Sequence, residues 1–172
     1  MSEKKLTELL DQIARDPACA ILPAAGQVMV NVAHTVPEDM RAFYNLCGGC
    51  VIGRGSFYEA RIVAPAEVVL ANDIILGEYA AIAREEHSED PSWNWYIIAE
   101  VENGNWLSID FGLTHNGRCY DSFWETHRQM GNMPVIAASL TELLQQLYNH
   151  KDKRWYWLES GFQALGDTYD AT

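Results

Sequence analysis

The residues with the most reactive spacing are two cysteines, Cys47 and Cys50, which are separated by two glycines. A Cys-x-x-Cys redox pair is best placed at the N-terminus of a helix, where the helix dipole lowers the pKa of a thiol. This pair instead follows a predicted helix, so the dipole has the opposite sign. A zinc site would need two more ligands, and Cys19 and Cys119 would supply them only if the fold brought them close. We therefore predict buried, reduced cysteines beside a Gly-Gly turn.

Carboxylate and imidazole side chains offer two further candidate sites. Asp110 and His115 could form an acid–base pair across a turn, although an Asp before Gly112 is also typical of turn hydrogen bonds. His87 lies among acidic residues and could contribute to a cation site, with a solvated loop as the simpler interpretation. The sequence contains no nucleophile elbow, phosphate-binding lysine motif or His-Glu-x-x-His motif. We predict no catalysis, no metal and no cofactor.

Composition restricts the class of protein further. The chain has 172 residues, 48% of them hydrophobic and 21% charged, which favours one folded domain over residues 1–172. There is no apolar run of roughly 18 residues for a membrane helix and no signal-peptide pattern, so we expect a cytoplasmic protein. Twelve basic and 24 acidic side chains give a net charge of −12, which disfavours nucleic acid as a partner. The negative charge either maintains solubility or attracts a basic partner.

Hydrophobic spacing predicts two helices in the N-terminal third. The first has apolar residues at positions 6, 9, 10 and 13, with Ser2 as its N-cap. The second begins near Pro37, where Thr35 and Glu38 have the spacing of a capping box, and ends at the glycine pair. Residues 18–34 are ambiguous, but valines at positions 28, 30 and 32 alternate as in a strand.

Apolar runs between turn signals predict a series of strands, at residues 51–52, 58–64, 95–101, 106–111, 119–124 and 135–137. A capping box from Ser139 to Glu142 opens a C-terminal helix, whereas residues 73–92 show little pattern beyond a helical stretch near 78–84. Strands in the middle with helices at both ends predict an α+β fold, in which a central, mostly antiparallel sheet is flanked by helices.

Tryptophan is abundant, with six residues in this length. Trp93, Trp95, Trp155 and Trp157 crowd at the ends of predicted elements, where we expect some of them to reach the surface. Exposed aromatic rings bordered by carboxylates are typical of protein-binding hot spots. The predicted partner-binding residues are Glu85, Glu86, Glu89, Asp90 and Trp93.

The order of several short motifs resembles the SUKH superfamily, over about residues 36–147. The helix that opens at Val36-Pro37 and continues through Phe43-Tyr44 to Gly48-Gly49 is similar to the start of that domain. The middle and the end are similar too, through Trp95, Ile97-Ile98-Ala99, Gly104-Asn105, Ile109-Asp110, Gly117, Tyr120 and the run from Ala137 to Leu144. Cys47 departs from the family pattern, which often has a polar residue there, and residues 73–92 match no family pattern.

The resemblance implies an α+β domain that binds a protein and catalyses nothing. The superfamily includes bacterial immunity proteins, which are cytoplasmic antidotes that occlude a cognate toxin, often a nuclease, and a domain of a fungal cell-wall-synthesis regulator. A nuclease binds a polyanion, so its cleft is basic and would attract a chain of net charge −12. We predict a cytoplasmic immunity protein whose partner is a basic toxin domain. A regulatory or scaffold protein of the same fold is the alternative, and a small enzyme is the third hypothesis.

Overall fold

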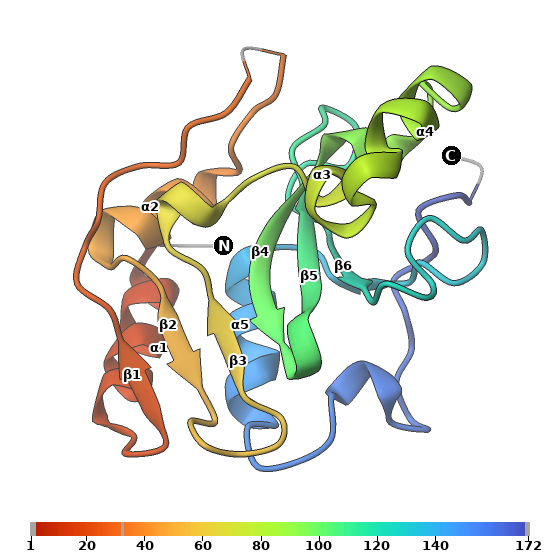
Figure 1. The fold of residues 1–172 in the computed structure, drawn as a ribbon. Helices are drawn as coiled ribbons and strands as arrows, with labels where there is room; N and C mark the ends of the chain where they lie inside the picture. The colour runs from red at the N-terminus through yellow and green to blue at the C-terminus, as the bar shows by residue number, and fades with distance from the viewer. Residues whose placement is uncertain (1–2, 32, 171–172) are drawn as a thin grey trace.

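The computed structural model describes residues 3–31 and 33–170, apart from the side chain of Asn103. Within these residues seven antiparallel strands form one sheet, and their order in space follows their order in the sequence (Figure 1). The strands are β1 (Cys19–Ile21), β2 (Cys50–Ile52), β3 (Ala60–Ile62), β4 (Trp95–Val101), β5 (Asn105–Asp110), β6 (Cys119–Ser122) and β7 (Val135–Ala137). Together with the helices, this sheet confirms the predicted α+β fold.

Three amphipathic helices form a layer behind the sheet in the view of Figure 1: α1 (Glu3–Arg15), α2 (Glu38–Leu46) and α5 (Leu140–Asn149). The leucines of α1 and α5, together with Phe43 and Tyr44 of α2, are buried in the core against the strands. The remaining helices are short: η1 (Pro65–Glu67), α3 (Ala71–Ile75), η2 (Gly77–Tyr79), α4 (Ala80–Glu86), η3 (Pro91–Asn94), η4 (Glu102–Gly104) and η5 (Tyr156–Leu158). The spacing of the apolar residues therefore predicted the main helices correctly, because each buries one continuous stripe.

The start of α5 receives hydrogen bonds from two parts of the chain. Ser139 Oγ accepts from the backbone N–H of Glu142 at 3.2 Å, which confirms the predicted cap. Asp39, from α2, accepts from the backbone N–H and the hydroxyl of Thr141 at 2.8 and 3.0 Å. Two N–H groups of the first turn, which have no partner inside the helix, are therefore satisfied, and α2 is joined to α5.

Two predictions for the N-terminal third are wrong. The N-cap position of α2 is Pro37, without a side-chain cap, so Thr35 lies two residues before the position that a capping box requires. The backbone of Thr35 is bonded to another part of the chain: its N–H donates to Phe111 O and its carbonyl accepts from Asn116. The described part of residues 22–34 contains no strand. Val28 and Val30 alternate because they pack against the core without pairing to a neighbouring strand. Val32 and the proposed N-cap Ser2 lie outside the described residues.

The turns of the sheet depend on glycine at two positions. Gly53, in the hairpin between β2 and β3, has a φ of +68°, and a Cβ there would lie 2.7 Å from the carbonyl oxygen of Lys151. Gly49 has a φ of +127° and approaches the carbonyl oxygen of Ile62. An L side chain would strain both positions, so the Gly-Gly segment serves as a tight entry into β2.

Candidate functional site

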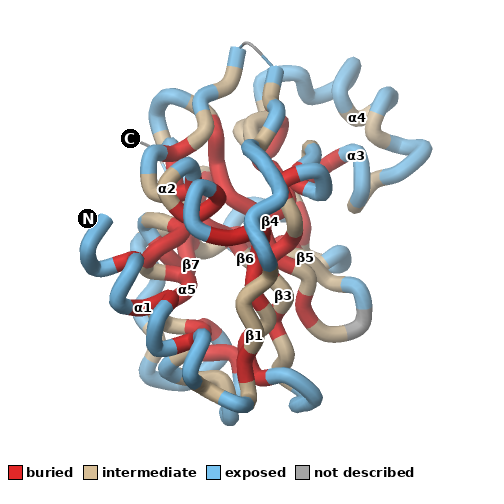
Figure 2. The backbone as a smooth tube through the Cα atoms, turned by 90° about the vertical axis from the view of Figure 1, so that its left-hand side faces the viewer, coloured by how far each residue is buried: buried red, intermediate tan, exposed pale blue. Residues whose placement is uncertain are grey.

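Residues 71–94, here called the arm, form a segment that projects from the rest of the molecule. It contains α3, η2, α4 and η3, and it projects beside the upper end of β4 (Figure 1). Helix α4 has no buried residue, and Figure 2 shows it exposed and away from the buried core. The arm therefore offers a helical surface that is available to a partner.

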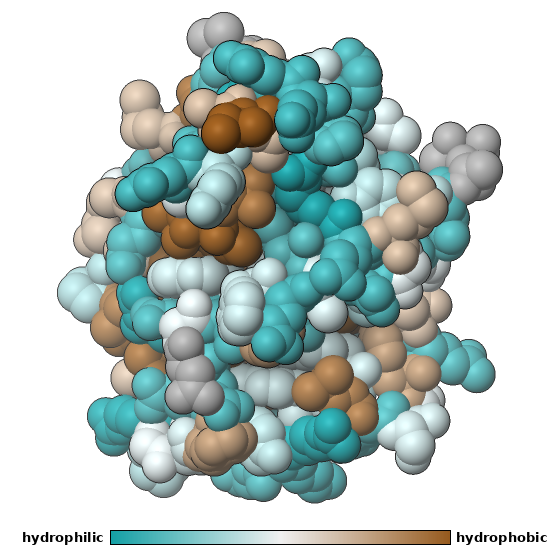
Figure 3. Space-filling model, turned by 45° about the vertical axis from the view of Figure 1, so that its right-hand side comes forward, coloured by the Kyte–Doolittle hydropathy of each residue, from teal (hydrophilic) through white to brown (hydrophobic). Residues whose placement is uncertain are grey.

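The arm combines negative charge with exposed apolar side chains. It carries six acidic residues and one basic residue, Arg84. Tyr79 is 73% exposed and Ile82 is 55% exposed. Tyr79, Ile82 and Glu85 follow one another at intervals of three residues. In a helix this spacing places their side chains on one face. Figure 3 shows apolar side chains in brown, bordered by polar ones in teal, on the upper part of this side of the molecule.

The predicted partner-binding residues fall into two groups. Glu85, Glu86 and Glu89 are exposed on the arm. Asp90 is only partly exposed and Trp93 is 5% exposed, and both lie at the base of the arm. Sequence reasoning missed Tyr79 and Ile82, because their exposure becomes visible only when α4 is found to bury nothing.

Trp93 holds the base of the arm together. Two guanidinium groups lie over its ring, with Arg84 at 4.9 Å and Arg128 at 5.3 Å from the ring centroid. Its indole N–H donates to the carbonyl oxygen of His87 at 2.8 Å. Trp93 is therefore a packing residue under the arm, and the cation–π contacts connect the arm to the loop that follows β6.

A polar cluster, here called the latch, joins the same base to the body. Asp90 accepts from the backbone N–H of Ser92 at 2.9 Å and the hydroxyl of Tyr169 at 3.0 Å, and it lies 3.5 Å from Arg128 Nη2. Asn72 Nδ2 donates to Ser92 Oγ at 2.9 Å, and Asn72 Oδ1 accepts from His127 Nε2 at 2.7 Å. The latch consists of these six residues: Asn72, Asp90, Ser92, His127, Arg128 and Tyr169.

Electrostatics keep the latch histidine neutral. Burial lowers the pKa of His127 to about 4, and the positive charge of Arg128 acts in the same direction. A neutral imidazole donates one hydrogen bond, here to Asn72. The arm is consequently fixed at its base while α4 stays exposed.

The tryptophans are placed differently from the prediction. Trp93, Trp95, Trp155 and Trp157 are all buried. Trp95 is stacked on Tyr120, with 4.2 Å between ring centroids. The exposed tryptophan is Trp124, at 65%. Position at the end of an element did not predict exposure, because these rings pack against side chains from other parts of the chain, such as Arg128 over Trp93 and Tyr58 against Trp155.

The candidate redox and acid–base residues contribute to the packing and hydrogen bonding of the fold. All four cysteines are free and buried, and burial raises the pKa of each thiol, so a thiolate nucleophile is disfavoured. Asp110 accepts from the backbone N–H of Gly112 at 2.6 Å and from Trp95 Nε1 at 3.2 Å. Burial raises its pKa to about 6. Asp110 and His115 both line a pocket of about 330 Å³, but the Nε2 atom of His115 forms no hydrogen bond.

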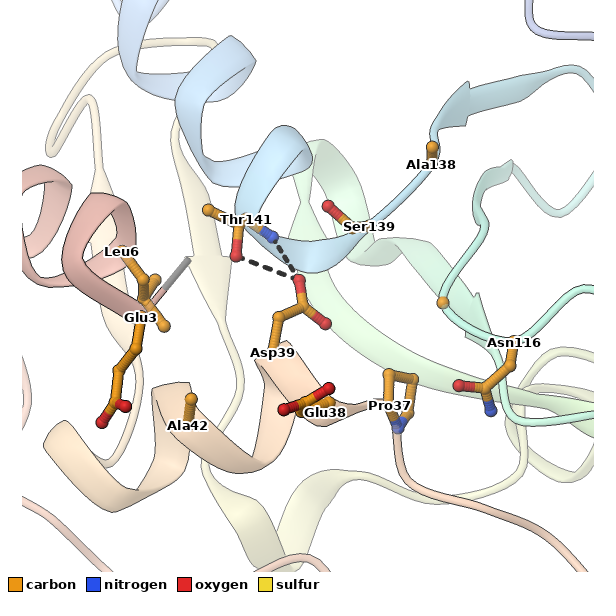
Figure 4. A pocket seen from close by; sticks show the side chains of 11 residues that line it. Glu3, Leu6, Pro37, Glu38, Asp39, Ala42, Asn116, Ala138, Ser139 and Thr141 are labelled. Carbon is orange, nitrogen blue, oxygen red and sulfur yellow. Dashed lines mark hydrogen bonds between the residues drawn. The ribbon is translucent and has the colours of Figure 1, made fainter. Parts of the chain in front are cut away.

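An acidic hollow of about 250 Å³ lies where α1, α2 and α5 meet (Figure 4). Glu3, Glu38 and Asp39 contribute its carboxylates. Figure 4 shows Asp39 directed at Thr141, with the two hydrogen bonds that hold the start of α5. Asp39 therefore has a structural role. Among the described residues, no three His, Cys, Asp or Glu side chains converge to form a metal site.

Fold and surface together define an α+β protein with a sheet in sequential order, a helical layer behind it and an exposed acidic arm. Residues 31–146, which include the arm, match the model of the SMI1 / KNR4 family (SUKH-1), and the chain belongs to that family. It is 40% identical over 162 residues to the Bacillus subtilis (strain 168) protein named Immunity protein YokJ, with 94% of each chain covered. The comparison with solved structures gave no match. In the described part of the chain, no helix is long and apolar enough to cross a membrane.

Proposed function

We propose that this chain is a cytoplasmic immunity protein that binds a basic toxin domain, such as the catalytic domain of a nuclease, and occludes it without catalysis. Its membership of the SMI1 / KNR4 family and its 40% identity to a protein named as an immunity protein support this role. The observation that carries the proposal is the arm, a segment with six acidic residues and one basic residue in which the side chains of Tyr79 and Ile82 are exposed.

The arm has the two properties that such an inhibitor needs. Its carboxylates attract a positively charged cleft over a distance comparable with the Debye length, about 8–10 Å in physiological salt, and so raise the association rate. Tyr79 and Ile82 lose their exposed apolar surface in the complex, which slows dissociation. The latch keeps the base of α4 ordered before binding, so less conformational entropy is lost on association.

Co-expression tests the proposal most simply. A bacterial host that expresses the toxin domain encoded beside this chain's gene should stop growing, and the chain should restore growth by forming a one-to-one complex. A chain that is folded and abundant but does not restore growth would contradict the immunity role. A stable complex with a partner that is not a toxin would instead favour the regulatory or scaffold alternative.

Arm variants test which surface is responsible. Tyr79→Ala combined with Ile82→Ala should weaken the toxin complex by roughly 30-fold or more, because hot-spot truncations cost about 2 kcal/mol or more. The matched control is Phe57→Ala with Leu46→Ala, which removes one exposed aromatic and one exposed aliphatic side chain away from the arm. Equal affinities for the two double variants, measured by calorimetry, would exclude the arm as the binding surface.

A further inference from the structure

A groove of about 510 Å³ lies at the end of β4 that is farther from the arm, between the ends of β4 to β6, the loop after β6 and η5. Its volume is within the range of roughly 300–1,000 Å³ that is usual for ligand sites. Apolar side chains form most of its walls, including Phe123, Trp155, Trp157 and Leu158. The rings of Trp155 and Trp157 are stacked, with centroids 5.2 Å apart and an interplanar angle of 12°. A stacked pair of indole rings therefore forms part of its apolar wall.

Two acidic residues, Glu102 and Asp121, also line the groove. Asp121 lines the groove, and its two oxygens accept from Trp157 Nε1 at 2.7 Å and from the backbone N–H of Phe123 at 3.2 Å. A carboxylate has about four acceptor positions, so Asp121 can accept further hydrogen bonds. Burial raises the pKa of Asp121, and no Lys or Arg among the described residues forms an ion pair with it. The charge of Asp121 thus lacks a positive counterpart.

This combination fits one side chain best. A guanidinium group is planar, stacks on aromatic faces and donates paired hydrogen bonds to a carboxylate. An ammonium group would gain the charge interaction but not the stacking or the paired geometry. A neutral apolar side chain would cover Asp121 without compensating its charge, which is unfavourable.

We propose that the groove binds an arginine side chain of the protein partner. The inference rests on the proposed function only for the identity of that partner, a basic toxin domain in which arginine is available. Phe123 and Thr126 line the groove, and the same loop continues into the latch at His127 and Arg128. One partner could therefore cover the arm and the groove together, with the arm providing attraction and the groove selecting an arginine.

The test uses the free full-length chain and two model compounds. N-acetyl-arginine N-methylamide is titrated into ¹⁵N-labelled protein, and the indole N–H signal of Trp157 is followed by NMR. N-acetyl-citrulline N-methylamide is the matched probe, because it replaces the guanidinium by a neutral urea of similar shape. The arginine compound should bind saturably and about tenfold or more tightly than the citrulline compound, a difference within the range of a desolvated cation–π contact with an ion pair.

Protein variants sharpen the result. Asp121→Asn should remove the preference for arginine, whereas Glu125→Gln, which deletes one exposed carboxylate of the same loop outside the groove lining, should keep it. If Asp121→Asn does not fold, the two compounds still decide the question on the wild-type chain. Equal binding of both compounds, or no binding, would overturn the proposal. A Trp157 signal that shifts on dilution without any compound would also overturn it, because a second copy would then occupy the groove.

The two proposals fail separately. Restored growth without a preference for arginine over citrulline would overturn the groove assignment and leave the immunity role in place. A clear preference for arginine without restored growth would contradict the immunity role and leave the chemistry of the groove intact.

Discussion

Helices α4 and α5 differ in what holds them in the structure. α5 buries four leucines and has side-chain caps from Ser139 and Asp39 at its start. α4 buries no residue, and its segment is fixed at the base by Trp93 and the latch. Burial is the main source of folding free energy, so the body behind the sheet supplies stability, while the arm can change its surface at little cost in stability. That division is consistent with the proposed role, in which the exposed arm binds the partner and the body supplies stability.

Truncation of one aliphatic side chain in each region should give the largest contrast. Leu144→Ala in α5 should lower the free energy of unfolding by about 3 kcal/mol, because Leu144 is completely buried and leaves a cavity. Ile82→Ala in α4 should change it by less than about 0.5 kcal/mol, as is usual for exposed sites. Urea unfolding measures both values. Similar losses for the two variants would mean that the arm also supports the core.

A fall in pH should lower the stability of the folded chain through His127, at the base of the arm, and raise it through Asp110, in the body. His127 has a pKa of about 4 when folded and 6.5 when unfolded, so the unfolded chain binds the extra proton and this group loses stability as the pH falls from 6.5 to 4. Asp110 has a pKa of about 6 when folded and 3.8 when unfolded, so the folded chain binds the extra proton and stability is gained over nearly the same range. Each contribution is roughly 3 kcal/mol at most, and the two nearly cancel.

Single variants should separate these contributions. His127→Gln should make the protein more stable at pH 4.5 relative to pH 7 than the wild type is, because the loss of stability caused by His127 is then absent while the gain from Asp110 remains. Asp110→Asn should do the reverse. Chemical denaturation at several pH values measures the difference between each variant and the wild type. Parallel pH profiles for all three proteins would show that neither group is perturbed by burial.

Removal of one carboxylate from each region should have a smaller and more local effect. Asp39→Ala takes two hydrogen bonds from the start of α5, and Asp90→Ala takes two hydrogen bonds and an ion pair from the latch. Each should cost about 1–2 kcal/mol. Hydrogen exchange should accelerate in α5 for the first variant and in residues 71–94 for the second. Acceleration in the same segments for both would contradict the separation of arm and body.

The same contrast explains how much could be predicted from the sequence. The helices of the body were visible because leucines repeat at helical spacing, and Ser139 with Glu142 marked the start of α5. The arm gave a weak signal, since a helix that buries nothing has no hydrophobic period. Its acidic residues Glu85, Glu86 and Glu89 could be proposed from charge alone, but Tyr79 and Ile82 could not.

Features that join distant parts of the chain were missed. Asp39 reaches a helix about a hundred residues later, and Asp121 meets Trp157 across 36 positions. Local patterns do not encode such contacts. The burial of Trp93 was missed for the same reason, because it depends on Arg128 from the loop after β6.

The central claim is that the arm captures a basic partner through its charge. Its most direct test is the association rate with the toxin domain, measured by stopped flow from low to high salt, for the triple variant Glu85→Gln, Glu86→Gln and Glu89→Gln. A control with the same net charge changes three exposed residues of α1 and α2: Glu8→Gln, Asp11→Asn and Glu38→Gln. The arm variant should associate roughly tenfold more slowly at low salt and show a weaker salt dependence than the control. Equal rates and equal salt dependence for the two variants would contradict the account.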